Sequence, residues 1–332
     1  MKRVGYVYDK MLDKEFIKAT IKKASKNKTN RRLVKRVLTN IDEYTDKIYE
    51  MIETENIVMR PTHQREIYEN GKVRKITVSP FYPNQILDYL LVETTKDIIR
   101  KSMYIYCVGN VNKRGIIYGK KAVEKNYKKY KHYMKLDIKH FYENVDVNTL
   151  ITLFERKIKD KRFIEFMKNV MEKQGLPIGT YYSQWFSNFY LCNFDHKVKE
   201  QHKIGFYIRN VDDMVFGDNN KRKLKNTYYE TKRYLYGIGL WYKYIPKIRT
   251  RVNFLGYIFE KSRTRLRHNI FYRTRRTVAN ISKHLCMSLV NRFISYYGWL
   301  KSIKIGYGYY INHIRPIIRI GTLKRIVSQG GI

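Results

Sequence analysis

Apolar residues recur every three or four positions through the first 60 residues of the chain. One such stripe consists of Leu38, Ile41, Tyr44, Ile48 and Ile52. This spacing predicts an amphipathic helix. Lysines and arginines cluster between the apolar positions, and we expect them to lie on solvated helix faces. Residues 1–60 are therefore predicted to form a basic, helical N-terminal segment.

The spacing then changes to an alternation of apolar and polar residues. Segments 65–69 and 72–78 are predicted to be two strands, because an Asn-Gly dipeptide between them favours a tight hairpin. Lys72 and Arg74 lie two residues apart, so both point to one face of the second strand. Two cations on a stiff hairpin suit a triphosphate. The simpler alternative is a pair of solvated cations on an edge strand.

A proline-rich break at 79–83 separates this hairpin from a predicted helix at 85–100. Residues 107–119 contain three glycines around Lys113 and Arg114 and are predicted to be a loop. A basic, glycine-rich loop lets a nucleic-acid backbone approach closely. It has no Walker signature, so no phosphate-binding P-loop is predicted.

Two adjacent carboxylates, Asp212 and Asp213, lie between short apolar runs in 206–218, a composition typical of a hairpin with its turn at the acidic pair. Like charges held this close are tolerated best when a cation lies between them. That cation is either a metal ion or a lysine or arginine of the chain. A solvated acidic turn is the plain alternative.

A third carboxylate, Asp137, ends an apolar strand that begins near residue 133. Three carboxylates can hold two Mg²⁺ about 3.5 to 4 Å apart, as phosphoryl-transfer enzymes require. The alternative role for Asp137 is a helix cap. Asp146 suits that role better, because it directly precedes the apolar residues of the next predicted helix.

The run Gly-Leu-Pro-Ile-Gly at 175–179 leads into a helical segment that reaches residue 190. Backbone N–H groups at such a helix start suit phosphate or ribose contacts. Further along, 222–236 is predicted to be a helix.

Composition narrows the class of partner. The chain has 332 residues, 43% of them hydrophobic, enough to build a core spread over two or three lobes. Its net charge of +39 calls for a polyanionic partner. We find neither an apolar run of 18 residues nor a signal peptide, so nucleic acid is favoured over a membrane.

Aromatic residues agree with this choice, because 31 Tyr, 15 Phe and 3 Trp provide stacking surfaces for single-stranded bases. An A/T-rich genome is a second explanation for so many tyrosines and lysines. Cys107, Cys192 and Cys286 are isolated, so neither a disulfide framework nor a zinc site is predicted, and a reducing cytosol is the expected setting.

The order of these blocks resembles a reverse transcriptase over about residues 60–300. The blocks are Lys72 with Arg74, Asp137 with Tyr142, Gly175 to Gly179, Asp212 with Asp213, and Phe254-Leu255-Gly256-Tyr257. Ile178-Gly179 followed by Ser183-Gln184 resembles specifically the enzymes of diversity-generating retroelements. Related intron and retron enzymes usually have Gln-Gly and Ser-Pro at these positions.

The resemblance implies an α+β fold of the right-hand polymerase type. Its parts would be fingers at 61–130, a palm with an antiparallel sheet at 131–260, a helical insertion at 147–175 near the fingers, and a thumb with a C-terminal tail at 261–332. It implies a cytoplasmic enzyme of bacterial, archaeal or phage origin. The expected partners are template RNA, a DNA or RNA primer, deoxynucleotides and a small basic helical accessory protein.

The resemblance also assigns roles to residues. Asp137, Asp212 and Asp213 would bind two Mg²⁺ ions and catalyse nucleotidyl transfer. The nucleotide would contact Lys72, Arg74, Tyr142 as a steric gate, Ile178, Gly179, Ser183 and Gln184. The primer grip would be Phe254, Leu255, Gly256 and Tyr257.

Several positions bear on fidelity, primer handling and catalysis. Ile178 cannot hydrogen-bond a base pair as glutamine does, so discrimination by shape alone predicts error-prone copying of template adenine. Asn210 replaces the usual tyrosine before the acidic pair, which leaves primer handling open. Lys243 is interpreted as a solvated lysine, or as a proton donor to pyrophosphate.

Two alternatives to a diversity-generating enzyme stay open. One is a defence-type or intron-like reverse transcriptase, and the other is a non-catalytic RNA-binding protein.

Overall fold

The computed structural model describes residues 3–69, 71–109, 111 and 113–329, without the side chains of Glu69 and Lys72. Its helices are α1 (Lys14–Ser25), α2 (Arg32–Thr39), α3 (Ile41–Glu53), α4 (Ile86–Ser102), α5 (Ile116–Tyr127), α6 (Val147–Glu155), α7 (Lys161–Val170), α8 (Tyr181–Tyr190), α9 (Cys192–Glu200), α10 (Lys221–Tyr236), α11 (His268–Lys283), α12 (Met287–Lys301), α13 (Lys304–Tyr309) and α14 (Ile320–Ser328). Its strands are β1 (His63–Glu69), β2 (Lys72–Val78), β3 (His132–Asp137), β4 (Phe206–Asn210), β5 (Asp213–Asp218), β6 (Ile248–Arg249), β7 (Val252–Phe254), β8 (Tyr257–Phe259) and β9 (Thr264–Leu266).

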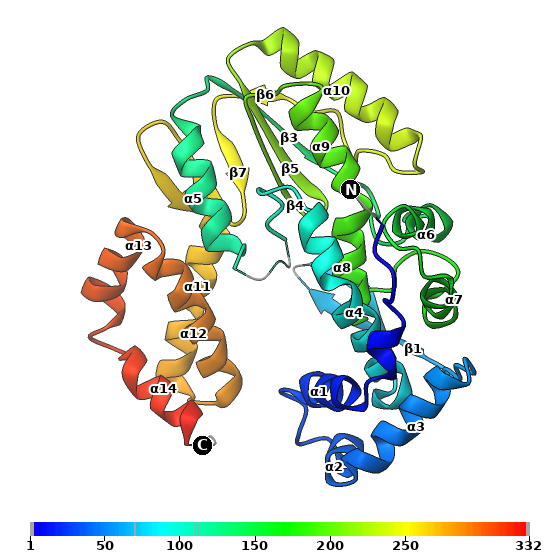
Figure 1. Cartoon of the computed structure of the whole chain (residues 1–332). Coiled ribbons are helices and arrows are strands. Elements are labelled where there is room, and N and C mark those ends of the chain that lie inside the picture. Colours follow the sequence, from blue (N-terminus) through cyan, green and yellow to red (C-terminus); the bar gives the residue numbers. More distant parts are fainter. Residues whose placement is uncertain (1–2, 70, 110, 112, 330–332) are drawn as a thin grey trace.

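An antiparallel sheet in the order β4-β5-β3-β6 lies at the centre of the molecule (Figure 1). Because side chains alternate along a strand, each face of the sheet packs into a different core. Met134 and Leu136 point to the face covered by α8, α9 and α10. Tyr133 and Val215 point to the other face, where α5, the β7–β8 hairpin and the C-terminal helices pack. This second face also carries Asp137 and Asp213, which lie in alternation with Tyr133 and Val215.

The N-terminal segment is helical, as predicted, but the stripe from Leu38 to Ile52 is divided between two helices, because α2 ends at Thr39 and α3 begins at Ile41. Tyr44, Ile48 and Ile52 of α3 are buried, and α3 packs against α1, which in turn contacts α4. Figure 1 shows α1–α3 on one side of the molecule and α11–α14 on the other, joined by the central sheet. None of the described helices is both long and apolar enough to cross a bilayer.

Several local predictions are confirmed. The two hairpins form as β1–β2 and β4–β5, and β3 ends at Asp137. Asp146 caps α6, because its carboxylate accepts a hydrogen bond from the backbone N–H of Thr149. A carboxylate at this position satisfies one of the free N–H groups of the first helical turn.

The prediction of a loop through residue 119 is wrong at its end, because α5 already begins at Ile116. Gly119 lies inside this helix, where an added Cβ would stand 2.4 Å from Cδ1 of Leu255. The glycine therefore lets α5 pack closely against the β7–β8 hairpin and does not mark a loop.

The C-terminal helices are attached to the rest of the fold through the same hairpin. A Cβ at Gly256 would lie 2.6 Å from the Trp299 ring of α12, so the ring rests directly on the hairpin turn. The Tyr257 hydroxyl is 2.8 Å from Oγ of Ser302. Together these contacts hold α12 and the β7–β8 turn as one packed unit.

One buried acid makes the stability of the fold depend on pH. Burial raises the pKa of Asp88, in the first turn of α4, to about 8, although Lys28 nearby opposes the rise. A carboxyl that is neutral when folded favours the folded state at low pH, and this contribution is lost as pH rises from about 4 to 8. The Asp88→Asn variant should therefore be more stable than wild type at pH 8 by about 2 kcal/mol or more. Urea unfolding at pH 5 and pH 8 measures this; an equal difference at both pH values would contradict it.

Candidate active site

The three predicted carboxylates converge at one edge of the central sheet. Asp137 at the end of β3 pairs directly with Asp213 at the start of β5. Asp212 lies in the turn between β4 and β5, and its carbonyl accepts a hydrogen bond of 3.1 Å from the N–H of Ile138. Residues more than 70 positions apart in the sequence are thus held together by backbone pairing.

Burial and mutual repulsion set the charge of this cluster. Burial raises the pKa of Asp213 to about 6, against the opposing effect of Lys135, and the Asp137 carboxylate adds to the rise. Burial and then Asp137 also raise the pKa of Asp212. Both shifts follow mainly from burial of the carboxyl groups, and the mutual repulsion of the carboxylates adds to them.

Two lysines lie beside these carboxylates. Lys135 Nζ lies 2.9 Å from Oδ2 of Asp213, and Lys243 Nζ lies 3.7 Å from Oδ1 of Asp137. Lys135 precedes Asp137 by two residues on β3 and therefore points to the same face. Among the described residues, no three acidic, histidine or cysteine side chains already stand close enough together to form a metal-binding group.

One oxygen of the cluster fits a divalent cation nonetheless. Oδ1 of Asp213 is buried and has no hydrogen-bond partner. An acceptor left without a partner costs free energy, and hard cations such as Mg²⁺ bind carboxylate oxygens. The donor set of three carboxylates is therefore suitable for such an ion.

A fully buried arginine fixes the turn that carries Asp212. The Arg209 guanidinium is paired with Asp195 of α9 by bonds of 2.7 Å from Nε and 2.6 Å from Nη2. Its Nη1 donates to the Val211 carbonyl and to Oδ1 of Asn188, each at 3.1 Å. The Tyr207 hydroxyl donates to the same Asp195 carboxylate at 2.7 Å. This arginine thereby ties the acidic turn to α8 and α9.

The backbone of the turn is strained and tightly enclosed. Val211 has φ of 60°, a left-handed conformation unfavourable for a β-branched residue. A Cβ at Gly109 would lie 2.5 Å from Cγ2 of Val211, so only glycine fits opposite the turn. The Asn188 side chain donates to the Gly109 carbonyl at 2.6 Å and closes this arrangement.

The β1–β2 hairpin reaches toward the carboxylates through Arg74, whose charge partly opposes the rise that burial and Asp137 cause in the pKa of Asp212. The side chain of Lys72 lies outside the described residues. At its base the hairpin is fastened to the 175–179 run, because the Thr77 N–H donates to the Ile178 carbonyl at 2.7 Å. A Cβ at Gly179 would lie 2.4 Å from the Thr77 carbonyl oxygen.

This close approach predicts a strong effect for Gly179→Ala. The added methyl group should push β2 away from the loop, because Gly179 also has φ of 120°, which L-residues rarely adopt. We expect weaker binding of deoxynucleotides, measured as a raised KM in primer extension. Gly5→Ala is the control, since nothing lies within 4 Å of its added Cβ. Equal KM values for the two variants would contradict this account.

The other predicted nucleotide contacts differ in their surroundings. Tyr142 is half-buried, and burial raises the pKa of its hydroxyl, with the nearby Asp212 carboxylate adding to the rise. The Ser183 hydroxyl is buried and donates to the Pro177 carbonyl at 2.7 Å, so it shapes the loop. Gln184 is exposed and Ile178 half-buried. Their contacts with a nucleotide stay predictions.

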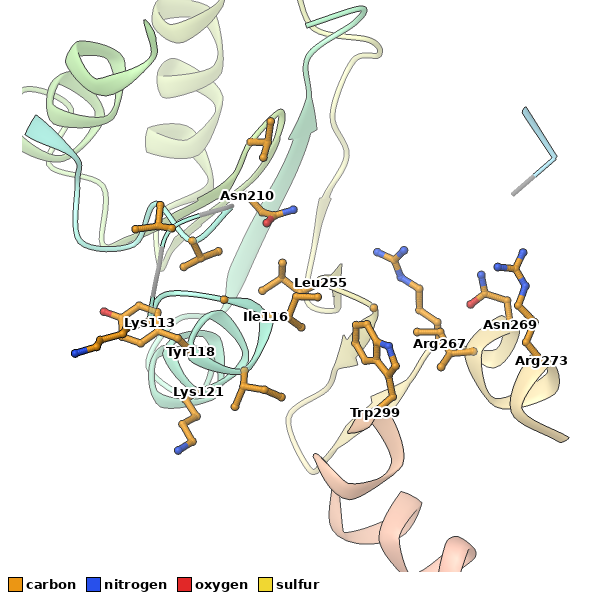
Figure 2. A pocket seen from close by; sticks show the side chains of 17 residues that line it. Lys113, Ile116, Tyr118, Lys121, Asn210, Leu255, Arg267, Asn269, Arg273 and Trp299 are labelled. Carbon is orange, nitrogen blue, oxygen red and sulfur yellow. The ribbon is translucent and has the colours of Figure 1, made fainter. Parts of the chain in front are cut away.

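A cavity of about 1360 Å³ adjoins the acidic turn. Figure 2 shows Asn210 and Leu255 on one side of the cavity and Lys113 and Tyr118 on another. Across the cavity lie Arg273, on α11, and Arg267, the residue directly before this helix. Leu255 and Gly256 both have positive φ, as a tight hairpin turn requires. The cavity is thus framed by the β4–β5 turn, α5, the predicted primer grip and the C-terminal helices.

Fold and site together define a polymerase of the right-hand type, with mixed helices and antiparallel sheets. The family model of reverse transcriptase (RNA-dependent DNA polymerase) matches residues 25–259. The chain therefore belongs to the reverse transcriptase family, whose members are RNA-directed DNA polymerases and thus nucleotidyltransferases. No curated protein sequence matches this chain.

A solved structure of telomerase shows the same fold. Apo telomerase from Candida tropicalis has a TM-score of 0.52 at 13% identity, covering 88% of this chain and 64% of that one. The form truncated from the C-terminal domain has a TM-score of 0.48 at 15% identity, covering 63% and 56%. The chain thus spans less than two thirds of these telomerase chains.

Some residues of the site were missed by the sequence-based predictions. Lys135 could have been found, because it lies two residues before Asp137 and must share its face. Arg209 and Asp195 carry no comparable signal, since arginine is rarely buried and the two partners sit on different elements.

Proposed function

We propose that the chain copies RNA into DNA by nucleotidyl transfer at Asp137, Asp212 and Asp213. The observation that supports this most is the pairing of Asp137 with Asp213 beside a large basic cavity, in a chain of the reverse transcriptase family. The net charge of +39 provides the general affinity for a template and primer.

Asp137, Asp212 and the unpartnered Oδ1 of Asp213 would hold two Mg²⁺ ions. When bound, such ions lower the pKa of the primer 3′-hydroxyl and neutralise the leaving pyrophosphate. Arg74 would pair with the triphosphate, and the Tyr142 ring would lie under the sugar, where a 2′-hydroxyl has no room. Lys243 keeps Asp137 oriented through their contact of 3.7 Å.

Primer extension on a defined RNA tests this function. The purified chain, given an annealed DNA primer, deoxynucleotides and Mg²⁺, should add nucleotides directed by the template. Extension should be absent without template. If RNA binds normally but no nucleotide is added under any divalent ion, the chain is a non-catalytic RNA-binding protein and the proposal fails.

We further propose that the enzyme belongs to the diversity-generating type and copies template adenine inaccurately. The support is the Ile178-Gly179 run, whose isoleucine offers only shape to a base pair. This type works with a structured template RNA and a small basic helical accessory protein, in the cytoplasm. A defence-type or intron-like enzyme is the alternative, and accurate copying of adenine would favour it.

Ile178→Gln should therefore reduce errors at template adenines, because an amide can hydrogen-bond where an aliphatic group cannot. The expected reduction is about tenfold, the scale of one polar contact that discriminates. Sequencing of the cDNA measures it, with Ile178→Val as the control that keeps a branched apolar side chain. Error rates that are the same in all three proteins would remove the link between this residue and fidelity.

A further inference from the structure

A second, smaller cavity of about 380 Å³ lies on the acidic face of the central sheet and is rich in cations. Lys135, Lys247, Arg249 and Arg251 line it, together with Tyr244 and Asn253. It is separate from the large cavity beside Asn210, with which it shares no lining residue.

Strand register explains why the cations gather there. Arg249 on β6 pairs directly with Tyr133 on β3, so it points to the same face as Tyr133 and Lys135. Lys247 precedes Arg249 by two residues and Arg251 follows it by two, which favours a common direction for all three in an extended segment.

These positive charges are compensated only in part. Lys135 is paired with Asp213, and Arg251 lies 3.9 Å from Glu260, which also binds Arg265 at 2.7 Å. No carboxylate of the described residues lies within 4.0 Å of Lys247 or Arg249. Like charges held around one cavity repel each other, and an anion among them relieves that cost.

Size and chemistry specify the anion. A cavity of this volume falls within the range of small-molecule sites and is too small for a duplex. Lysines provide point contacts and arginines forked contacts to phosphate oxygens. Four such side chains match an ion with several phosphate oxygens better than a single carboxylate or halide.

We propose that this cavity binds a short polyphosphate, either free pyrophosphate or the phosphate tail of a nucleotide. Lys135 connects this cavity to the carboxylate cluster, because its side chain lines the cavity and its Nζ lies 2.9 Å from Oδ2 of Asp213. A bound polyphosphate competes with Asp213 for this lysine and so leaves the carboxylate freer to bind a cation. Only the origin of the anion rests on the proposed function, since DNA synthesis releases pyrophosphate beside Asp213.

Calorimetric titration of the full chain with inorganic pyrophosphate, without divalent ions, tests the site. Wild type should show one saturable site, and Lys247→Gln/Arg249→Gln should bind about tenfold more weakly or worse, because two charge-assisted contacts are lost. Both side chains are exposed, so the fold should persist, and an unchanged thermal midpoint verifies this. The control is Lys221→Gln/Lys225→Gln on α10, which removes the same charge from exposed positions on the helix covering the opposite face.

Three outcomes would overturn the proposal. The first is no saturable binding by wild type, and the second is equal weakening in both double variants, which would mark general attraction to a basic protein. The third is loss of single-stranded RNA binding in Lys247→Gln/Arg249→Gln with pyrophosphate affinity retained, which would make the cavity part of the nucleic-acid path. A parallel titration of wild type and Lys247→Gln/Arg249→Gln with dATP separates the two sources. A larger loss of pyrophosphate affinity in the double variant indicates the free ion, and a larger loss of dATP affinity indicates the nucleotide tail. Because no step of DNA synthesis is measured, failure here leaves the proposed polymerase activity standing.

Discussion

Asp212→Asn should lower the single-turnover rate of primer extension by about 1,000-fold or more. The substitution removes one negative charge from a cluster in which Asp137 and Asp213 are its near neighbours. Losing a ligand that helps to stabilise transition-state charge costs several kcal/mol, and each 1.36 kcal/mol is about a factor of ten in rate. Affinity for RNA should stay within about twofold, since the net charge of +39 is barely altered.

Asp146→Asn is the matched control for this variant. It makes the same chemical change at an exposed helix cap that lies outside the carboxylate cluster. Asparagine caps helices about as well as aspartate, so both stability and extension should be close to wild type. Extension that survives in Asp212→Asn, or is lost equally in Asp146→Asn, would show that the acidic turn is not the catalytic centre.

Arg209→Met should have the second-largest effect, on both stability and rate. Asp195 would be left buried without its partner, which typically costs about 3 to 5 kcal/mol. The Val211 carbonyl would lose the Nη1 bond that holds the acidic turn. A displacement of about 1 Å in a catalytic group can lower kcat by about 100-fold. Urea unfolding and steady-state extension measure the two effects.

The double variant Arg209→Met/Asp195→Leu separates folding from positioning. Replacing a buried ion pair by apolar side chains often restores stability, so this protein should unfold at a denaturant concentration near wild type. Its kcat should nevertheless stay low with KM for deoxynucleotides little changed, because the turn still lacks its anchor. Recovery of kcat together with stability would mean that Arg209 acts only through folding.

Much of the fold could be predicted from local patterns in the sequence. An Asn-Gly dipeptide and alternating residues were enough for the β1–β2 hairpin, and an apolar run ending in Asp137 located the end of β3. Backbone rules of this kind depend on neighbours in the sequence. The convergence of Asp137 with Asp213 followed from family resemblance, since no local rule pairs strands so far apart.

The features that were missed depend on close packing between distant elements. Gly119 was interpreted as part of a loop, whereas it makes room for Leu255 against α5. Likewise, Trp299 rests on Gly256, and nothing in either local sequence indicates this contact. The ion pair of Arg209 with Asp195 could not be predicted from the sequence either, because burial is a property of the assembled fold.

The central claim is that Asp137, Asp212 and Asp213 form one site for divalent cations. Fe²⁺ bound in place of Mg²⁺ and treated with ascorbate and peroxide cleaves the backbone near its ligands, so mapping the fragments locates the site. The account predicts cuts near the end of β3 and at the β4–β5 turn in wild type, and their loss in Asp212→Asn. Cuts at other positions, or cuts at these positions that persist in the variant, would contradict it.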